Sequence, residues 1–282
     1  MKVLVTGATG QLGFDVCAEL ARRGAEHWGV SSREMDLRDD ASVRRAVLDY
    51  GPDAVIHCAA WTRVDAAEDD PAECWAVNAD GTARLAAACR EAGAKMLYIS
   101  TDYVFPGDGE RFYEPDDPTR PAGVYGKSKL AGEEAVRSAL ERYFIVRISW
   151  VFGKNGGNFV KTMLRLSESR DLLRVVDDQI GSPTYTRDLA PLLCDMIETE
   201  KYGVYHATNE GVCSWAELAR EIFALTGRTV TVQGVTTEEY GARAPRPKNS
   251  RMSKDCLTRA GFARLPDWHD ALERYLKEIE AI

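Results

Sequence analysis

Short apolar runs alternate with longer amphipathic stretches through the first half of the chain. The apolar runs are β-prone and bounded by polar residues or glycine, so they predict buried strands. These strands are expected at residues 3–6, 27–30, 53–57, 96–99 and 143–148. Between them, apolar residues recur at helical spacing, most clearly at 11–24, 42–50, 74–91 and 125–141, while residues 61–68 read as a loop. Strands that alternate with helices are typical of an α/β fold with a parallel sheet.

A glycine-rich turn joins the first predicted strand to the first helix. Residues 7–13 read Gly-Ala-Thr-Gly-Gln-Leu-Gly. Gly7 permits the tight turn, Gly10 lets the backbone approach a pyrophosphate, and Gly13 allows close helix packing. The helix then offers its free N–H groups to the phosphates. The alternative is a merely tight turn, but the context predicts a Rossmann-type, doubly wound parallel sheet that binds a dinucleotide.

The hydrophobic pattern loosens after Gly153, where helices and short strands no longer alternate regularly. Helices are expected near 158–167, 189–198, 214–226 and 267–279, with strands at 174–177, 203–206 and 229–232. We therefore expect a smaller mixed α/β substrate domain beside the Rossmann domain. The predicted NAD(P)-binding domain covers 1–152 with a returning segment at about 174–200, and the substrate domain covers 153–173 and 201–282.

The residues after the second and third strands indicate which dinucleotide binds. NAD-binding folds place a carboxylate at the end of the second strand, but here Arg33 follows two serines. A guanidinium suits a 2′-phosphate, which favours NADPH, although Arg33 could simply face solvent. Asp36 and Leu37 could contact the adenine, or Asp36 could cap a turn. The small residues Ala59 and Ala60 leave room for a cofactor at the sheet edge.

Three polar side chains around the fourth strand suggest proton-transfer chemistry. Thr101 ends the strand, at the edge where open parallel sheets bind ligands. After a proline-rich loop at 105–125, expected to be a rim or a lid, Tyr125 and Lys129 share one helix face at i, i+4 spacing. A nearby ammonium should lower the pKa of the tyrosine, which suits it to proton transfer near neutrality. Outside a dinucleotide-binding fold, a tyrosine and a lysine at this spacing are usually surface residues without a role in catalysis.

Net charge limits the classes of partner, and the cysteines and histidines predict neither a disulfide framework nor a metal site. The net charge of −8 argues against nucleic acid or an anionic membrane as the main partner. Seven scattered cysteines without a C-x-x-C pair predict buried thiols in a reducing cytosol, and four dispersed histidines predict no catalytic metal. His57 is expected to be a hydrogen-bonded strand-end residue. With no leader pattern and no membrane-length apolar stretch, we expect a soluble, cytoplasmic protein.

Seven motifs together resemble the extended short-chain dehydrogenase/reductases, and within them the dTDP-4-dehydrorhamnose reductase family. They lie at residues 6–13, 59–62, 100–105, 125–129, 147–150, 178–184 and 246–250. The resemblance covers essentially the whole chain. It implies reduction of the C4 ketone of dTDP-6-deoxy-L-lyxo-4-hexulose to dTDP-L-rhamnose with NADPH, or with NADH.

The resemblance also implies roles for individual residues. Tyr125 would protonate O4, Lys129 would bind the nicotinamide ribose and poise Tyr125, and Thr101 would hydrogen-bond the reacting oxygen. The remaining cofactor contacts would be Gln11, Leu12 and Trp61, and the substrate contacts would be Thr62, Val64, Thr101, Asp102, Trp150 and, through the diphosphate, Arg246. One departure is Trp61, where the family usually has tyrosine.

Three further expectations come from the resemblance. The chain is expected to form a homodimer, and some members of the family hold Mg²⁺ at a dimer interface, although no ligands for it can be placed here. One alternative keeps the chemistry and changes the sugar to another nucleotide 4-keto-deoxysugar. The other is a non-catalytic subunit, because the family resembles the β regulatory subunit of methionine adenosyltransferase.

Overall fold

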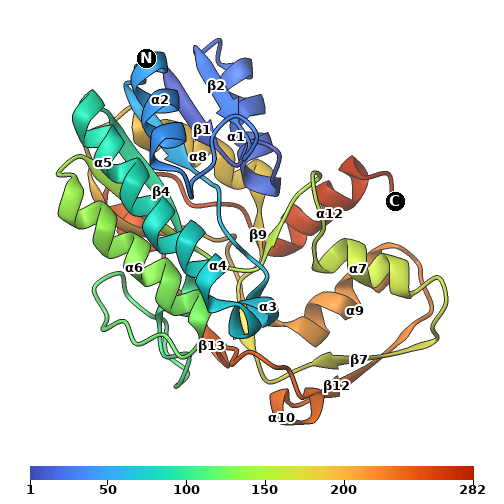
Figure 1. Cartoon of the computed structure of the whole chain (residues 1–282). Coiled ribbons are helices and arrows are strands. Elements are labelled where there is room, and N and C mark those ends of the chain that lie inside the picture. Colours follow the sequence, from blue (N-terminus) through green and yellow to red (C-terminus); the bar gives the residue numbers. More distant parts are fainter.

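A six-stranded parallel sheet forms the centre of the computed structural model, which describes all residues 1–282 (Figure 1). Its strand order is β10-β5-β4-β3-β1-β2. The strands are β1 (Val3–Thr6), β2 (His27–Val30), β3 (Ala54–His57), β4 (Lys95–Thr101), β5 (Tyr143–Ile148) and β10 (Gly203–His206). The strand order reverses between β1 and β3, which makes this edge the topological switch point where such sheets bind ligands.

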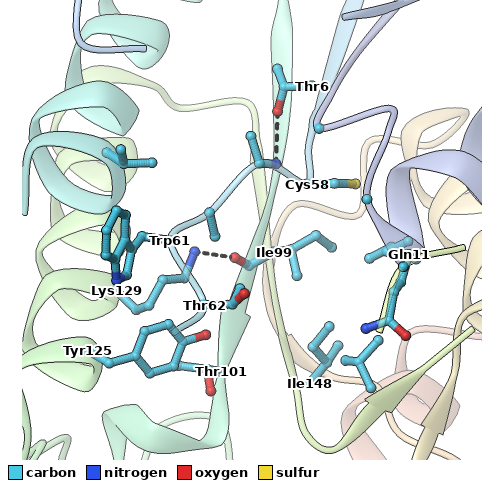
Figure 2. Close-up of a pocket in the computed structure, with 18 of the residues that line it drawn as sticks. Thr6, Gln11, Cys58, Trp61, Thr62, Ile99, Thr101, Tyr125, Lys129 and Ile148 are labelled. Atoms are coloured by element: carbon cyan, nitrogen blue, oxygen red, sulfur yellow. Dashed lines mark hydrogen bonds between the residues drawn. The ribbon is translucent and has the colours of Figure 1, made fainter. Parts of the chain in front are cut away.

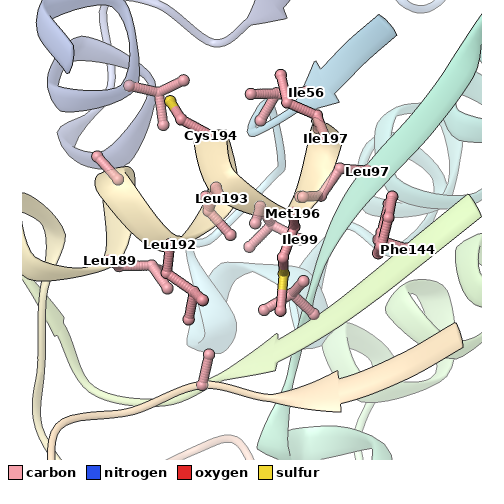
Figure 3. Close-up of a cluster of buried hydrophobic side chains, with 14 of the residues drawn as sticks. Ile56, Leu97, Ile99, Phe144, Leu189, Leu192, Leu193, Cys194, Met196 and Ile197 are labelled. Atoms are coloured by element: carbon pink, nitrogen blue, oxygen red, sulfur yellow. The ribbon is translucent and has the colours of Figure 1, made fainter. Parts of the chain in front are cut away.

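Helices cover both faces of this sheet. One face packs against α1 (Gln11–Arg22) and α8 (Thr186–Ile197), and Figure 3 shows Leu193 and Met196 of α8 beside sheet residues. The other face is covered by α2 (Asp40–Tyr50), α5 (Thr82–Ala92) and α6 (Val124–Ala139). The predicted α/β fold with a Rossmann-type, doubly wound parallel sheet is confirmed.

The rest of the chain builds a smaller mixed α/β part below the sheet in Figure 1. The helices of this part are α7 (Phe159–Leu166), α9 (Trp215–Leu225), α10 (Thr237–Tyr240), α11 (Asp255–Arg259) and α12 (Trp268–Glu278). A third apolar core, separate from the two that flank the large sheet, lies among α7, α9 and α12. The strand pairs are β7 (Leu172–Val176) with β12 (Thr231–Val235) and β6 (Val151–Phe152) with β9 (Thr184–Tyr185), while β8 (Ile180–Gly181) lies between β11 (Cys213–Ser214) and β13 (Asn249–Ser250).

The segment that returns to the large sheet differs from the predicted 174–200. Residues 172–176 form β7, which pairs with β12 outside that sheet. The return consists of α8 and β10, and β10 pairs with β5. Residues 256–265 also pack into the core of the large sheet. The predicted range 201–282 for the smaller domain therefore includes segments that belong to the Rossmann core.

Two local predictions also need correction. Residues 61–68 were expected to form a loop, but α3 (Val64–Asp69) occupies its second half. The helix predicted over 74–91 is three segments, α4 (Pro71–Trp75), a π-helical segment (Ala76–Gly81) and α5. Helical periodicity cannot distinguish i→i+4 from i→i+5 hydrogen bonding over a single turn.

His57 and most of the cysteines have the buried environments that the sequence predicted. His57 is fully buried and bonds Thr6 and Thr82 through its two ring nitrogens. All seven cysteines are free, and five of them are buried. No helix reaches the length and hydrophobicity that a membrane span requires. No group of three or more His, Cys, Asp or Glu side chains is arranged to hold a metal ion.

Candidate active site

A cleft of about 870 Å³ opens at the carboxyl ends of the central strands (Figure 2). Most of the predicted site residues line it. These are Gly7, Gly10, Gln11, Leu12, Asp36, Leu37, Ala59, Ala60, Trp61, Thr62, Val64, Thr101, Asp102, Tyr125, Lys129 and Trp150. Three predicted residues are not in its lining, namely Gly13, Arg33 and Arg246. The strand-end position thus brings together residues that are far apart in the sequence.

The glycine-rich turn has the shape that a pyrophosphate site needs. Gly7 has a φ of +68°, and a Cβ there would lie 2.8 Å from the backbone nitrogen of Ala59. A Cβ at Gly13 would lie 2.2 Å from the carbonyl oxygen of Gly7, so only glycine lets α1 approach the turn. Gly10 is the N-cap of α1, and no side chain caps this end. Its first N–H groups therefore remain available to an anion.

The π-helical segment positions the wall of the cleft opposite this turn. Asn78 is buried within it, accepts the backbone N–H of Trp61 at 2.8 Å and donates to the carbonyl oxygen of Trp61 at 3.0 Å. Trp61 is thereby held in the wall of the cleft, where Figure 2 labels it. Its indole nitrogen Nε1 is buried and has no hydrogen-bond partner. A buried donor without a partner is uncommon in proteins and fits a wall that receives a polar ligand.

Thr101 is the last residue of β4 and is 5% exposed. Its hydroxyl donates to Asp102 Oδ1 at 2.9 Å and accepts the backbone N–H of Tyr103 at 3.3 Å. Asp102 is buried as well and accepts a second hydrogen bond, 2.5 Å long, from the Ser250 hydroxyl. Burial raises the pKa of Asp102 to about 6, although both hydroxyl donors oppose the shift.

Tyr125 and Lys129 lie on the first two turns of α6, and both face the cleft. Figure 2 shows the phenol of Tyr125 directed toward Thr101. Lys129 Nζ donates to the carbonyl oxygen of Ile99 at 2.8 Å and lies 4.1 Å from the centroid of the Tyr98 ring. Burial lowers the pKa of Lys129 to about 7, although the nearby Glu133 carboxylate opposes this shift.

The predicted effect of Lys129 on Tyr125 is not what the structure shows. Burial raises the pKa of Tyr125 above its usual value, and the Thr101 hydroxyl only partly opposes this change. Desolvation of the phenol has the largest effect on this pKa, and the i, i+4 spacing of Tyr125 and Lys129 in the sequence gives no measure of it. Tyr125 is therefore held as a neutral phenol, the form that can donate a proton.

A buried ion pair fixes the helix that carries Tyr125 and Lys129. Glu133, one turn further along α6, is fully buried and binds Arg147 of β5 through two hydrogen bonds of 2.8 Å. Ser100 of β4 donates to the same carboxylate at 2.6 Å. Arg147 also donates to the carbonyl oxygen of Pro115 in the rim loop, at 3.0 Å. These contacts tie α6 to both neighbouring strands and to the rim.

The substrate side of the cleft has an aromatic wall that the sequence only partly predicted. Trp150 has a φ of +50°, which is strained for a bulky residue. Its ring stacks on Trp215 of α9 at 3.8 Å between centroids, and a Cβ at Gly181 would lie 2.9 Å from its Cε2 atom. Trp215 lines the cleft but was predicted only as the start of a helix, because its partner Trp150 is distant in sequence.

Two predicted arginine roles do not match the positions of the side chains. Arg246 forms two hydrogen bonds with Asp65, of 3.0 and 2.6 Å, instead of lining the cleft. Arg33 is exposed outside the cleft, while Arg38 lines it and pairs with Asp36 at 2.8 Å. Arg38 was missed because only the residues directly after β2 were considered.

Three features together define an NAD(P)-binding oxidoreductase of the short-chain dehydrogenase/reductase class. They are the parallel sheet, the glycine-rich turn whose N–H groups are available to an anion, and the pair of Tyr125 and Lys129. Comparisons with known proteins agree with this class. The family model for the RmlD substrate binding domain matches residues 1–281. The chain therefore belongs to the RmlD family.

Individual relatives extend this result over nearly the whole chain. The dTDP-4-dehydrorhamnose reductase of Streptomyces griseus is 45% identical over 276 residues, which cover 95% of this chain and 91% of the relative. The spore coat polysaccharide biosynthesis protein SpsK of Bacillus subtilis is 44% identical, covering 98% and 97% of the two chains. The crystal structure of the Bacillus anthracis dTDP-4-dehydrorhamnose reductase in complex with NADP is 43% identical, superposes with a TM-score of 0.96, and covers 98% and 99%.

Proposed function

We propose that this enzyme reduces the C4 ketone of a dTDP-4-dehydro-6-deoxy-L-sugar to give dTDP-L-rhamnose, with NADPH as the hydride donor. The proposal rests on one observation: Thr101, Tyr125 and Lys129 line the same cleft. The glycine-rich turn, whose N–H groups are available to an anion, lies on the opposite side of that cleft. Relatives named for this reaction are similar over nearly the full length.

The proposed mechanism assigns proton transfer to the protein. When bound, the nicotinamide supplies a hydride to C4 of the sugar. Tyr125 gives its phenolic proton to O4, so that the ketone gains one hydride and one proton and becomes an alcohol. Lys129 carries the positive charge that stabilises the remaining phenolate, and it binds the nicotinamide ribose. Thr101 hydrogen-bonds O4 and orients the carbonyl for the transfer.

The adenosine end of the cleft supports NADPH as the preferred cofactor, with NADH possible. Ser31, Ser32 and Arg38 line the cleft after β2, and none of them would repel a 2′-phosphate. Asp36 is held by Arg38 and is therefore partly neutralised. We infer that Arg38, instead of Arg33, contacts the 2′-phosphate.

Substrate contacts are proposed for Thr62, Val64, Asp102 and Trp150, which all line the cleft. Arg246 can reach a diphosphate only by leaving Asp65, so its role stays a prediction. A homodimer also stays a prediction, as does Mg²⁺ at an interface between two chains. The cytoplasmic location predicted from the sequence is likewise untested.

The direct test follows NADPH absorbance after adding enzymatically prepared dTDP-6-deoxy-L-lyxo-4-hexulose, and identifies the product by NMR. Oxidation of NADPH with formation of dTDP-L-rhamnose would support the proposal. A product with the opposite configuration at C4 would favour another deoxysugar pathway. Tight NADPH binding without turnover of any dTDP-4-keto sugar would contradict the proposed reaction and favour a regulatory role.

A further inference from the structure

A second loop reaches the glycine-rich turn from the smaller part of the molecule. Residues 153–158 read Gly-Lys-Asn-Gly-Gly-Asn and connect β6 to α7, and we call them the clasp loop. Three of them, Gly156, Gly157 and Asn158, line the cleft beside Gln11.

The first contact of the clasp loop is made by Asn155. Its amide nitrogen Nδ2 donates to the carbonyl oxygen of Thr9 at 2.7 Å and lies 3.4 Å from that of Gly10. Both carbonyls belong to the glycine-rich turn. A carbonyl oxygen that turned toward a pyrophosphate would repel it, whereas the neighbouring N–H groups attract it. Asn155 therefore holds these oxygens in place and leaves the N–H groups to the ligand.

The second contact is made by Asn158, the N-cap of α7. Its Oδ1 atom accepts the backbone N–H of Lys161 at 3.0 Å. Its Nδ2 atom donates to the side chain of Gln11 at 3.0 Å and to the Tyr275 hydroxyl at 2.9 Å. Gln11 is the first residue of α1, so the starts of α1 and α7 are joined through this side chain.

The two glycines between these asparagines leave space next to the turn. Gly156 has a φ of +75°, a conformation that favours glycine, and a Cβ at Gly157 would have no atom within 4 Å. Both glycines are exposed to the cleft. Lys161 Nζ donates to the carbonyl oxygen of Gly156 at 2.9 Å and so supports the loop from the opposite side.

We propose that the clasp loop forms the second wall of the site for the cofactor's pyrophosphate, and that Asn155 is a positioning residue for the glycine-rich turn. This inference rests on the dinucleotide cofactor of the proposed function and does not depend on the sugar. Because NADPH and NADH share the pyrophosphate, Asn155 must affect both cofactors equally. An arginine at the 2′-phosphate would affect NADPH alone.

The test is a calorimetric titration of NADP⁺ and NAD⁺ into the full-length protein without any sugar. Asn155→Ala is expected to raise the Kd of both dinucleotides about tenfold, which corresponds to about 1.4 kcal/mol. Asn155→Ser keeps a hydroxyl donor and is expected to recover part of this loss. The matched control is Arg165→Ala on α7, outside the clasp loop, which removes an exposed cation and is expected to change either Kd by less than about twofold.

Two additional readouts separate positioning from a general loss of structure. The melting temperature without ligand should be the same for Asn155→Ala and the wild type, and kcat at saturating NADPH should be close to normal while its KM rises. Wild-type affinity of Asn155→Ala for both dinucleotides would overturn the proposal. So would an equal loss in Arg165→Ala, or a loss confined to NADP⁺. If Asn155→Ala weakens the binding of both dinucleotides as expected, but the wild type does not reduce the sugar, the proposed reaction is contradicted and the role of Asn155 is not.

Discussion

Burial of the polar groups in this site shifts their pKa values. Lys129 is 2% exposed and Asp102 is 3% exposed, and the pKa values of both shift toward the neutral form. Tyr125 shifts in the same sense, toward the neutral phenol. A site from which water is largely excluded strengthens each charge that develops during a reaction, because little solvent screens it.

The Tyr125 phenol is predicted to be essential for turnover and dispensable for binding. Tyr125→Phe keeps the ring and its edge contact with Tyr103, at 5.4 Å between centroids, and removes only the proton donor. We expect kcat to fall by about 10²–10⁴-fold with the Kd of NADPH nearly unchanged. Stopped-flow reduction and fluorescence titration measure the two quantities, and wild-type-like turnover would refute the assigned role.

Asp102 makes stability depend on pH in a defined window. Its pKa is 3.8 in a model compound and about 6 in the fold, so the folded state binds the proton more tightly. Stability of the wild type relative to Asp102→Asn should therefore fall by about 1–3 kcal/mol as pH rises from about 4 to 6. Urea denaturation across this range measures the difference. A constant difference would show that the carboxyl is not perturbed in the fold.

The two arginines near the adenosine end should differ in their effects. Arg38→Ala is expected to raise the Kd of NADPH about tenfold and that of NADH only slightly, because a 2′-phosphate would lose its cation. Arg33→Ala serves as the control, since Arg33 is exposed outside the cleft. If Arg33→Ala has the larger effect on NADPH, the assignment made from the sequence is right and the one made from the cleft lining is wrong.

At the scale of elements, one ion pair sets the position of α6. Glu133 and Arg147 are 0% and 1% exposed, and without Arg147 the buried Glu133 carboxylate keeps only the partly exposed Arg137, at 3.0 Å, as an ion-pair partner. Arg147→Met should lower the free energy of unfolding by about 3–5 kcal/mol. The exposed pair of Arg44 and Glu91 offers the control, because Arg44→Met should cost less than about 1 kcal/mol.

A double variant separates the charge from the packing. Glu133→Gln combined with Arg147→Met leaves no buried charge, so its loss of stability should be smaller than the sum of the two single losses. Urea denaturation of the four proteins completes the cycle. Additive losses would mean that the pair contributes only through its packing.

Elements that bury one continuous apolar run could be predicted from the sequence alone. Strands β1 and β5 lie where they were expected, and α9 begins within one residue of the helix expected over 214–226, after a capping box of Ser214 and Glu217. The return of the chain to the large sheet was predicted only in part: α8 lies within the expected 174–200 and β10 was expected as a strand, but its pairing with the distant β5 was not. Pairing between distant segments leaves no local pattern.

At the scale of the whole molecule, the site residues that belong to a sequence motif could be predicted. The site residues that reach the cleft from other parts of the chain could not. Thr101, Tyr125 and Lys129 belong to motifs and meet in the cleft. Trp215 and Asn155 reach the site from other elements, and only the tertiary structure brings them there. The same reason explains Arg246, whose partner Asp65 could not be known from spacing.

The interleaved core of the large sheet has a consequence for how the chain is made. Its hydrophobic cluster contains residues of α8 and β10 and also Leu257 and Leu265, which are synthesised well after the first five strands. The first five strands therefore leave the ribosome long before the helix and the edge strand that cover them. Exposed apolar surface and an open strand edge favour aggregation, so nascent chains of this protein should need a chaperone during this interval. For the same reason, a fragment that ends at residue 152 should not fold alone.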